Sequence, residues 1–188
     1  MRTISFILIL CFSLLKLQAQ ENYMTRNGQI SFFSSTPLED IKAINNEVAS
    51  VMNRKTGSVQ FIVLIKSFQF RKAAMQDHFN GKDYMDSDRY PKAELKGTIT
   101  NISTVDFTKD GTYPVTVEGT LSMHGVSNKI KTAGNIIVKG STVTATAVFT
   151  IKLVDYKISV PTIVSKKIAE KVEVTVNCNY QLYQPKTK

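Results

Sequence analysis

The segment Val172 to Tyr183, which reads VEVTVNCNYQLY, decides the fold class of this chain. Apolar and polar side chains alternate along it without interruption, and the apolar set consists of Val172, Val174, Val176, Cys178, Tyr180 and Leu182. Successive side chains of a strand point to opposite faces of a sheet. A period of two therefore predicts a β-strand that is buried on one face.

Two further segments repeat this alternation, Val143 to Leu153 and Tyr113 to His124, with Val148 the single apolar residue out of phase. Weaker strand candidates cover residues 28–34, 41–52, 59–70, 93–105 and 128–139. The last of these leads into the strand at Val143 through Lys139-Gly140-Ser141, a tight hairpin signal. Short connections of this kind predict antiparallel pairing of neighbouring strands.

Residues 41–52 also fit a helix, because Leu38, Ile41 and Val48 share a helical face behind the capping box Thr36-Pro37-Leu38-Glu39. Asparagine is a poor residue for a helix interior, and two stand at 45 and 46. We therefore predict a strand. Arg71 to Arg89 fits no strand, being polar and rich in aspartate, and it contains a short helical signal at 73–75.

Eight strands with one apolar face must cover that face, and closing the sheet on itself does so while removing its edges. We predict an all-β, eight-stranded antiparallel barrel with a helix and loop excursion at about residues 71–89; a sandwich is the alternative. Small residues on the expected inner face predict empty space, namely Gly97, Gly119, Gly134, Ala145 and Ala147. The alternative is that neighbouring Phe and Tyr side chains fill it.

A barrel with space inside suits one elongated apolar ligand. Alternation alone selects the candidate ligand-binding residues, which are Phe61, Val63, Leu95, Val117, Leu121, Phe149, Ile151 and Tyr180. A shift of one residue in register would turn each of these side chains to the other face.

Residues 1–19 have the pattern of a secretory signal peptide. A basic start is followed by an apolar run from Ile4 to Leu15, which is shorter than the roughly 20 residues of a membrane-spanning helix, and by Ala19 at a cleavage point. The mature domain would then be residues 20–188, secreted or periplasmic. It retains one cysteine, Cys178, which cannot form an intrachain disulfide and is predicted to be a buried hydrophobe.

The chain is basic, with 24 Lys and Arg against 15 Asp and Glu, a net charge of +9. Loss of Arg2 and Lys16 with the signal peptide would lower this to +7. Nucleic-acid binding would favour arginines interleaved with exposed aromatics, and this surplus is mainly lysine, so we expect no nucleic-acid partner. The lysines fit peripheral contact with an anionic membrane surface; the C-terminal half holds Lys129, Lys131, Lys139, Lys152, Lys157, Lys166, Lys167 and Lys171. Homodimerisation stays open.

Motifs for catalysis or metal binding are weak. His78 and His124 stand 46 positions apart, and neither has a Cys, Asp or Glu at the spacing of known zinc sites. No Gly-x-Ser-x-Gly motif occurs, and Asp83, Asp86 and Asp88 make a poor calcium loop. We expect no enzymatic activity, no metal and no cofactor.

Three stretches resemble motifs of the YceI-like family. They are His78-Phe79-Asn80 with Tyr84-Met85-Asp86 and Tyr90-Pro91-Lys92-Ala93, then Gly119 to Ser127 (GTLSMHGVS), and Val154 to Ile158 (VDYKI) ahead of the strand at Val172. The chain departs from the family's pattern at Arg26 to Phe33 and at Asp155-Tyr156-Lys157. The resemblance implies a lipocalin-like barrel, secreted to the periplasm or beyond, that holds a polyisoprenoid or similar long-chain lipid for transport, storage or sequestration.

Two other functional classes stay open as alternatives to lipid binding. One is a structural or stress-response envelope module without a ligand, in which the barrel core is filled. The other is an outer-membrane barrel, since eight is a permitted strand number, although no aromatic girdle is evident in the sequence.

Overall fold

The computed structural model describes residues 21–159 and 168–183. The predicted signal peptide, Lys166 and Lys167 lie outside these ranges. The elements are β1 (Asn22–Ser35), β2 (Asp40–Asn53), β3 (Ser58–Leu64), η1 (Ile65–Ser67), β4 (Gln69–Phe70), α1 (Ala73–Asn80), β5 (Lys92–Ile99), η2 (Ile102–Thr104), β6 (Gly111–Met123), β7 (Val126–Lys139), β8 (Thr142–Lys152), η3 (Leu153–Tyr156) and β9 (Lys171–Leu182).

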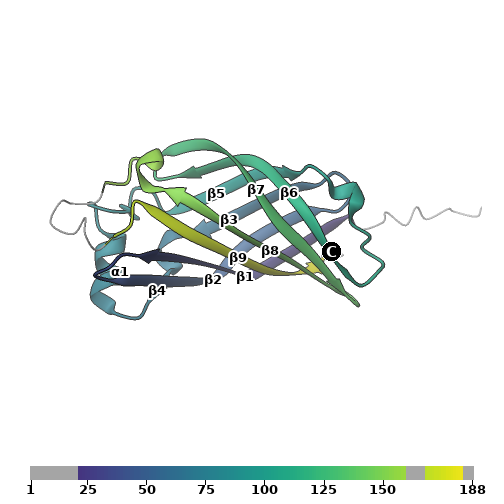
Figure 1. Ribbon diagram of the computed structural model, residues 1–188, viewed down its shortest axis with the longest axis horizontal. Coiled ribbons are helices and arrows are strands. Elements are labelled where there is room, and N and C mark those ends of the chain that lie inside the picture. The colour runs from purple at the N-terminus through teal and green to yellow at the C-terminus, as the bar shows by residue number, and fades with distance from the viewer. Residues whose placement is uncertain (1–20, 160–167, 184–188) are drawn as a thin grey trace, which may run out of the picture.

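Eight long antiparallel strands form a closed barrel (Figure 1). The strand order is β1-β9-β8-β7-β6-β5-β3-β2, and β1 pairs with β2 to complete the circle. The two-residue strand β4 adds to the far end of β2. The predicted all-β barrel and its excursion at about residues 71–89, which contains α1, are confirmed. The prediction of a strand at residues 41–52 is confirmed as well.

In β2 and the turn before it, the residues that resemble a helix start have other structural roles. Asn45 lies at a bulge in the β1–β2 register and is fully buried. Its Nδ2 donates to the Leu64 carbonyl at 2.8 Å, and its Oδ1 accepts the Glu47 N–H at 2.8 Å. The capping-box bond also forms, because Thr36 Oγ1 accepts the Glu39 N–H at 3.1 Å, but it closes the β1–β2 turn. The same local bonds serve a turn as well as a helix start.

Two strands are shorter than the alternation predicts. β3 ends at Leu64, and the chain turns through η1 before β4. The apolar positions change phase there, from odd numbers up to Ile65 to even numbers at Phe68 and Phe70, which is the sequence mark of the break. β5 likewise ends at Ile99, ahead of η2.

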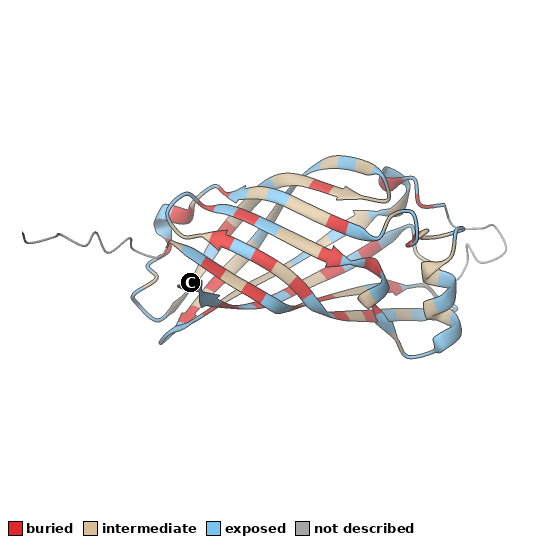
Figure 2. Cartoon of the chain, turned by 180° about the vertical axis from the view of Figure 1, so that it is seen from behind, coloured by how far each residue is buried: buried red, intermediate tan, exposed pale blue. Residues whose placement is uncertain are grey.

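The apolar faces of the strands point into the barrel, so buried and exposed residues alternate along them (Figure 2). Val148, the residue out of phase, lies on the outer face with 57% of its surface exposed. None of the helices in the described residues is long and apolar enough to cross a membrane.

Two of the inward-facing glycines do not create the space that the sequence predicts from them. Gly97 and Gly119 face each other across β5 and β6. A Cβ on either glycine would lie 2.6 Å from a backbone oxygen of the neighbouring strand. These two residues therefore allow close approach of strands. None of the five small residues lines the cavity described below.

Candidate functional site

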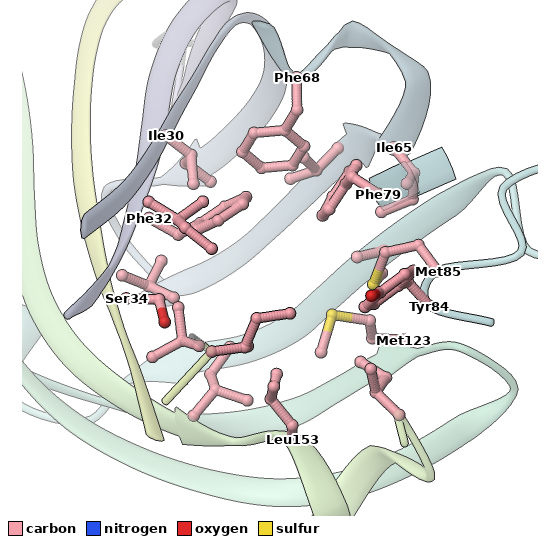
Figure 3. A pocket seen from close by; sticks show the side chains of 18 of the residues that line it. Ile30, Phe32, Ser34, Ile65, Phe68, Phe79, Tyr84, Met85, Met123 and Leu153 are labelled. Atoms are coloured by element: carbon pink, nitrogen blue, oxygen red, sulfur yellow. The ribbon is translucent and has the colours of Figure 1, made fainter. Parts of the chain in front are cut away.

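The barrel contains an apolar cavity of about 450 Å³ in the half that ends at α1. Side chains from α1 and from all the long strands line it, and Figure 3 shows Phe32, Phe68, Met85, Met123 and Leu153 around one space. Ligand cavities for small molecules span about 300–1,000 Å³ and are mostly apolar. The size and lining are therefore those of a binding site for an apolar molecule.

Six of the eight residues selected from the sequence line this cavity: Phe61, Val63, Leu95, Leu121, Phe149 and Ile151. The structure places Val117 and Tyr180 elsewhere. Val117 packs against the core of the opposite half, where it pairs with Ile99. The side chains of Val117 and Tyr180 point into the barrel, but they lie beyond the end of the cavity.

Tyr180 belongs to the filled half of the barrel. It is 1% exposed, and its hydroxyl lies 2.6 Å from Ser50 Oγ. Ser50 Oγ donates to the Gln60 carbonyl at 2.8 Å, so the Tyr180 hydroxyl is the donor in its bond to Ser50. Burial raises the pKa of the Tyr180 hydroxyl. The ring and its hydrogen bonds fill the space that a ligand would need there.

Cys178 lies beside Tyr180 and is the buried hydrophobe that the sequence predicts. Its exposed fraction is 0%. A Cβ on Gly28 would lie 2.5 Å from its Sγ, so the sulfur packs directly against this glycine. Burial raises the pKa of the thiol to about 12. Because the thiolate is the reactive form, this cysteine is chemically inert.

Four phenylalanines at the α1 end were missed by the sequence reasoning. Phe79 of α1 lies 5.5 Å from Phe32 and 5.0 Å from Phe70, between ring centroids. Phe68 completes the cluster at 5.3 Å from Phe32. Such ring pairs stabilise beyond their buried area. For Phe68 and Phe70 the phase change before Phe68 was the available signal, because it separates these two rings from the strand that ends at Leu64.

The helix α1 is held in place by this cluster. None of its residues is buried, and the side chain of Lys72, its N-cap residue, makes no capping hydrogen bond. A helix of eight residues is marginal by itself. Its position over the end of the barrel therefore depends on Phe79 and on Met75, which also lines the cavity.

A few polar groups line the cavity besides the apolar ones. Glu39 forms an ion pair with Lys72 at 3.5 Å, and Ser34 Oγ accepts the Ala169 N–H at 2.9 Å. His78 and Tyr84 belong to α1 and the loop that follows it. Most of the polar lining thus gathers at the α1 end. An amphipathic molecule would place its polar end there.

The two histidines do not form a joint site. His124 occupies the β6–β7 turn with a φ of 51°, and its Nδ1 lies 3.0 Å from the Tyr156 carbonyl oxygen. His78 is exposed on α1. Within residues 21–159 and 168–183, no group of three His, Cys, Asp or Glu side chains is placed to hold a metal ion.

The family follows from the sequence itself. The family sequence model of the YceI-like domain matches residues 21–180 of this chain. The chain belongs to the YceI-like family. No curated protein sequence matches it.

Solved YceI-like structures share the fold at low sequence identity. A polyisoprenoid binding domain from Saccharophagus degradans, implicated in plant cell wall breakdown, superposes with a TM-score of 0.75 at 15% identity over 87% of this chain and 99% of its own. Burkholderia cenocepacia BcnA gives 0.68 at 18% identity over 81% and 95%. A Campylobacter jejuni YceI protein gives 0.58 at 15% identity over 74% and 84%. The extended barrel is therefore shared with these three solved structures.

Proposed function

We propose that this YceI-like protein binds a polyisoprenoid or a similar long-chain apolar lipid inside its barrel, for transport, storage or sequestration. The observation that carries the proposal is the apolar cavity of about 450 Å³, which the filled half of the barrel closes at one end. The polyisoprenoid-binding domain from Saccharophagus degradans, which shares the fold, supports this class of ligand.

The energetics of burial favour a chain over a compact polar molecule. Removing apolar surface from water contributes about 25 cal/mol per Å². A polar ligand would instead lose hydration without gaining hydrogen bonds, because the inner wall offers mainly Val, Ile, Leu and Phe side chains. The lipid would lie along the barrel with its polar end near Glu39, His78 and Tyr84.

The cellular setting is part of the proposal. The apolar run at Ile4 to Leu15 and the residues after it support secretion or export to the periplasm. The lysine surplus supports peripheral contact with an anionic membrane surface. We propose a binding role without catalysis or cofactor, and turnover by lipid-free protein would contradict it. Homodimerisation stays open.

Native mass spectrometry of the mature protein, purified from its own envelope without detergent, tests this function. Solvent extraction and identification of the released adduct follow. A stoichiometric isoprenoid or other long-chain lipid is the expected result. A mass without adduct, together with no uptake of added polyisoprenoid, would contradict the proposal and favour the ligand-free envelope module.

The variant Ala93→Phe supplies the matched control. Ala93 lines the cavity and is 7% exposed, so a phenyl ring there would occupy ligand space. We expect the variant to carry less adduct than the wild type under the same purification. Equal occupancy in both proteins would place the lipid outside the cavity.

A further inference from the structure

The barrel wall is interrupted between β7 and β8. The two strands are paired from the hairpin, where Lys139 faces Thr142, to the pair Gly134 and Ala147, and no further. Beyond that point β7 continues to Val126 on the edge of β6, and β8 continues to Lys152 on the edge of β9. Figure 1 shows the two strands diverging toward the end that carries α1.

We define this interruption as the β7–β8 seam, with residues 126–133 on one side and 148–152 on the other. In the part of the chain that the structure describes, no hydrogen bond joins these two segments directly. The seam is bridged at its end by η3, where Asn128 Nδ2 donates to the Asp155 carbonyl at 2.7 Å and His124 contacts the Tyr156 carbonyl.

A second parting, between β2 and β3, differs because it is sealed. β2 and β3 pair only from Ala49 to Met52. There β4 supplies backbone bonds to β2, and the buried Asn45 side chain bonds the Leu64 carbonyl. Among residues 21–159 and 168–183, only side chains lie across the middle of the β7–β8 seam. Opening it breaks no backbone ladder.

The seam leads directly to the cavity. Ile130 of β7 and Phe149 and Ile151 of β8 line the cavity and lie on the two edges of the seam. On the outer rim, Val148 is 57% exposed and Val154 of η3 is 74% exposed. Apolar side chains thus continue from the outer surface to the interior.

Charge on the outer face also favours separation of the two strands. If the pairing register continued past Gly134, Lys129 would face Lys152. Like charges directly opposite each other on neighbouring strands are destabilising. The nearest ion pair on β7, between Lys131 and Glu118 at 2.8 Å, points to β6 and does not offset this repulsion.

We propose that the β7–β8 seam is the passage through which the apolar chain enters and leaves the cavity. This inference rests on the proposed function and adds a route to it. The competing route is the end of the barrel under α1, where the aromatic cluster and the pair of Lys72 with Glu39 would have to separate.

Cross-linking tests the two routes in mature protein. The variant Lys131→Cys/Thr150→Cys places outward-facing thiols on opposite sides of the seam, and a short bis-maleimide joins them. The matched control Asn135→Cys/Thr146→Cys joins the same strands where they are already paired. Lys72→Cys/Glu39→Cys closes the α1 end instead. Native Cys178 is buried with its pKa raised to about 12, so it should not react, which the mass of treated wild type checks.

The readout is the rate of uptake and release of anthroyloxy-labelled stearate by stopped-flow fluorescence, before and after cross-linking. We expect the seam cross-link to slow both rates at least tenfold with little change in Kd, and the other two cross-links to have smaller effects. Unchanged rates for the seam cross-link, or equal or greater slowing by either of the others, would overturn the inference. If untreated protein bound neither this probe nor added polyisoprenoid, the proposed function would be overturned and the inference with it.

Discussion

The two halves of the barrel share one backbone design and differ in how they are filled. In one half, Tyr180, Met52 and Ile136 are at most 1% exposed and occupy the interior. In the α1 half, aliphatic and aromatic side chains of similar size surround about 450 Å³ of space. The hollow half therefore cannot be attributed to smaller residues. The difference coincides with where the strands part and where α1 and the aromatic cluster cover the end, so the packed core and the cavity are separated along the barrel axis.

Matched isoleucines should show the largest difference between the halves. Ile136→Ala removes methyl groups from a filled core and should lower the free energy of unfolding by about 2–5 kcal/mol. Ile151→Ala should cost less than half as much, because Ile151 already borders open space. Urea denaturation of both variants measures this. Equal losses would mean that the cavity collapses or is filled in solution.

The hydrogen-bonded pair in the filled half should show the next effect. Ser50→Ala leaves the buried Tyr180 hydroxyl without its acceptor and should cost about 1–3 kcal/mol of unfolding free energy. Tyr180→Phe should cost less, because Ser50 still donates to the Gln60 carbonyl. If Tyr180→Phe were the more damaging change, the donor assignment given above would be wrong.

Matched alanines separate binding from stability. Ala93→Phe should weaken binding of anthroyloxy-labelled stearate at least tenfold, about 1.4 kcal/mol, with little loss of stability. Ala145→Phe places the same ring between Ile136 and Cys178 in the filled half. It should destabilise by overpacking and leave the affinity of the folded protein unchanged. Fluorescence titration and urea denaturation together check both. A reversal of the two effects would contradict the division into halves.

The free energy of unfolding should decrease as the pH rises above 9. The thiol of Cys178 has an ordinary pKa of 9.0, which burial raises to about 12 in the folded protein. Between these values the unfolded chain has lost the proton that the folded chain keeps. Stability therefore decreases with pH, by up to about 1.4 kcal/mol per pH unit. Urea denaturation at pH 8 and pH 10 measures the slope, and Cys178→Ala should remove this contribution. A slope that the variant leaves unchanged would assign the loss to other groups.

Alternation of apolar and polar residues was sufficient to predict the strands that have one face toward the barrel interior and the other toward water. Val172 to Leu182 and Val143 to Ile151 could be placed because each residue is either inside or outside a barrel. The cavity residues Leu95 and Phe149 followed from the same rule. The rule failed for Tyr180 and Val117, because it gives the face of a residue but not its position along the barrel axis.

The sequence by itself determined the all-β class, the antiparallel pairing of neighbouring strands and the excursion that holds α1. Each depends on local periodicity and turn chemistry, which neighbouring residues encode. Only the tertiary structure decided which half is hollow, that Phe32 meets Phe79, and that β7 and β8 part beyond Gly134. These features depend on contacts between residues far apart in the chain, and a periodic pattern contains no information about the distance between such residues.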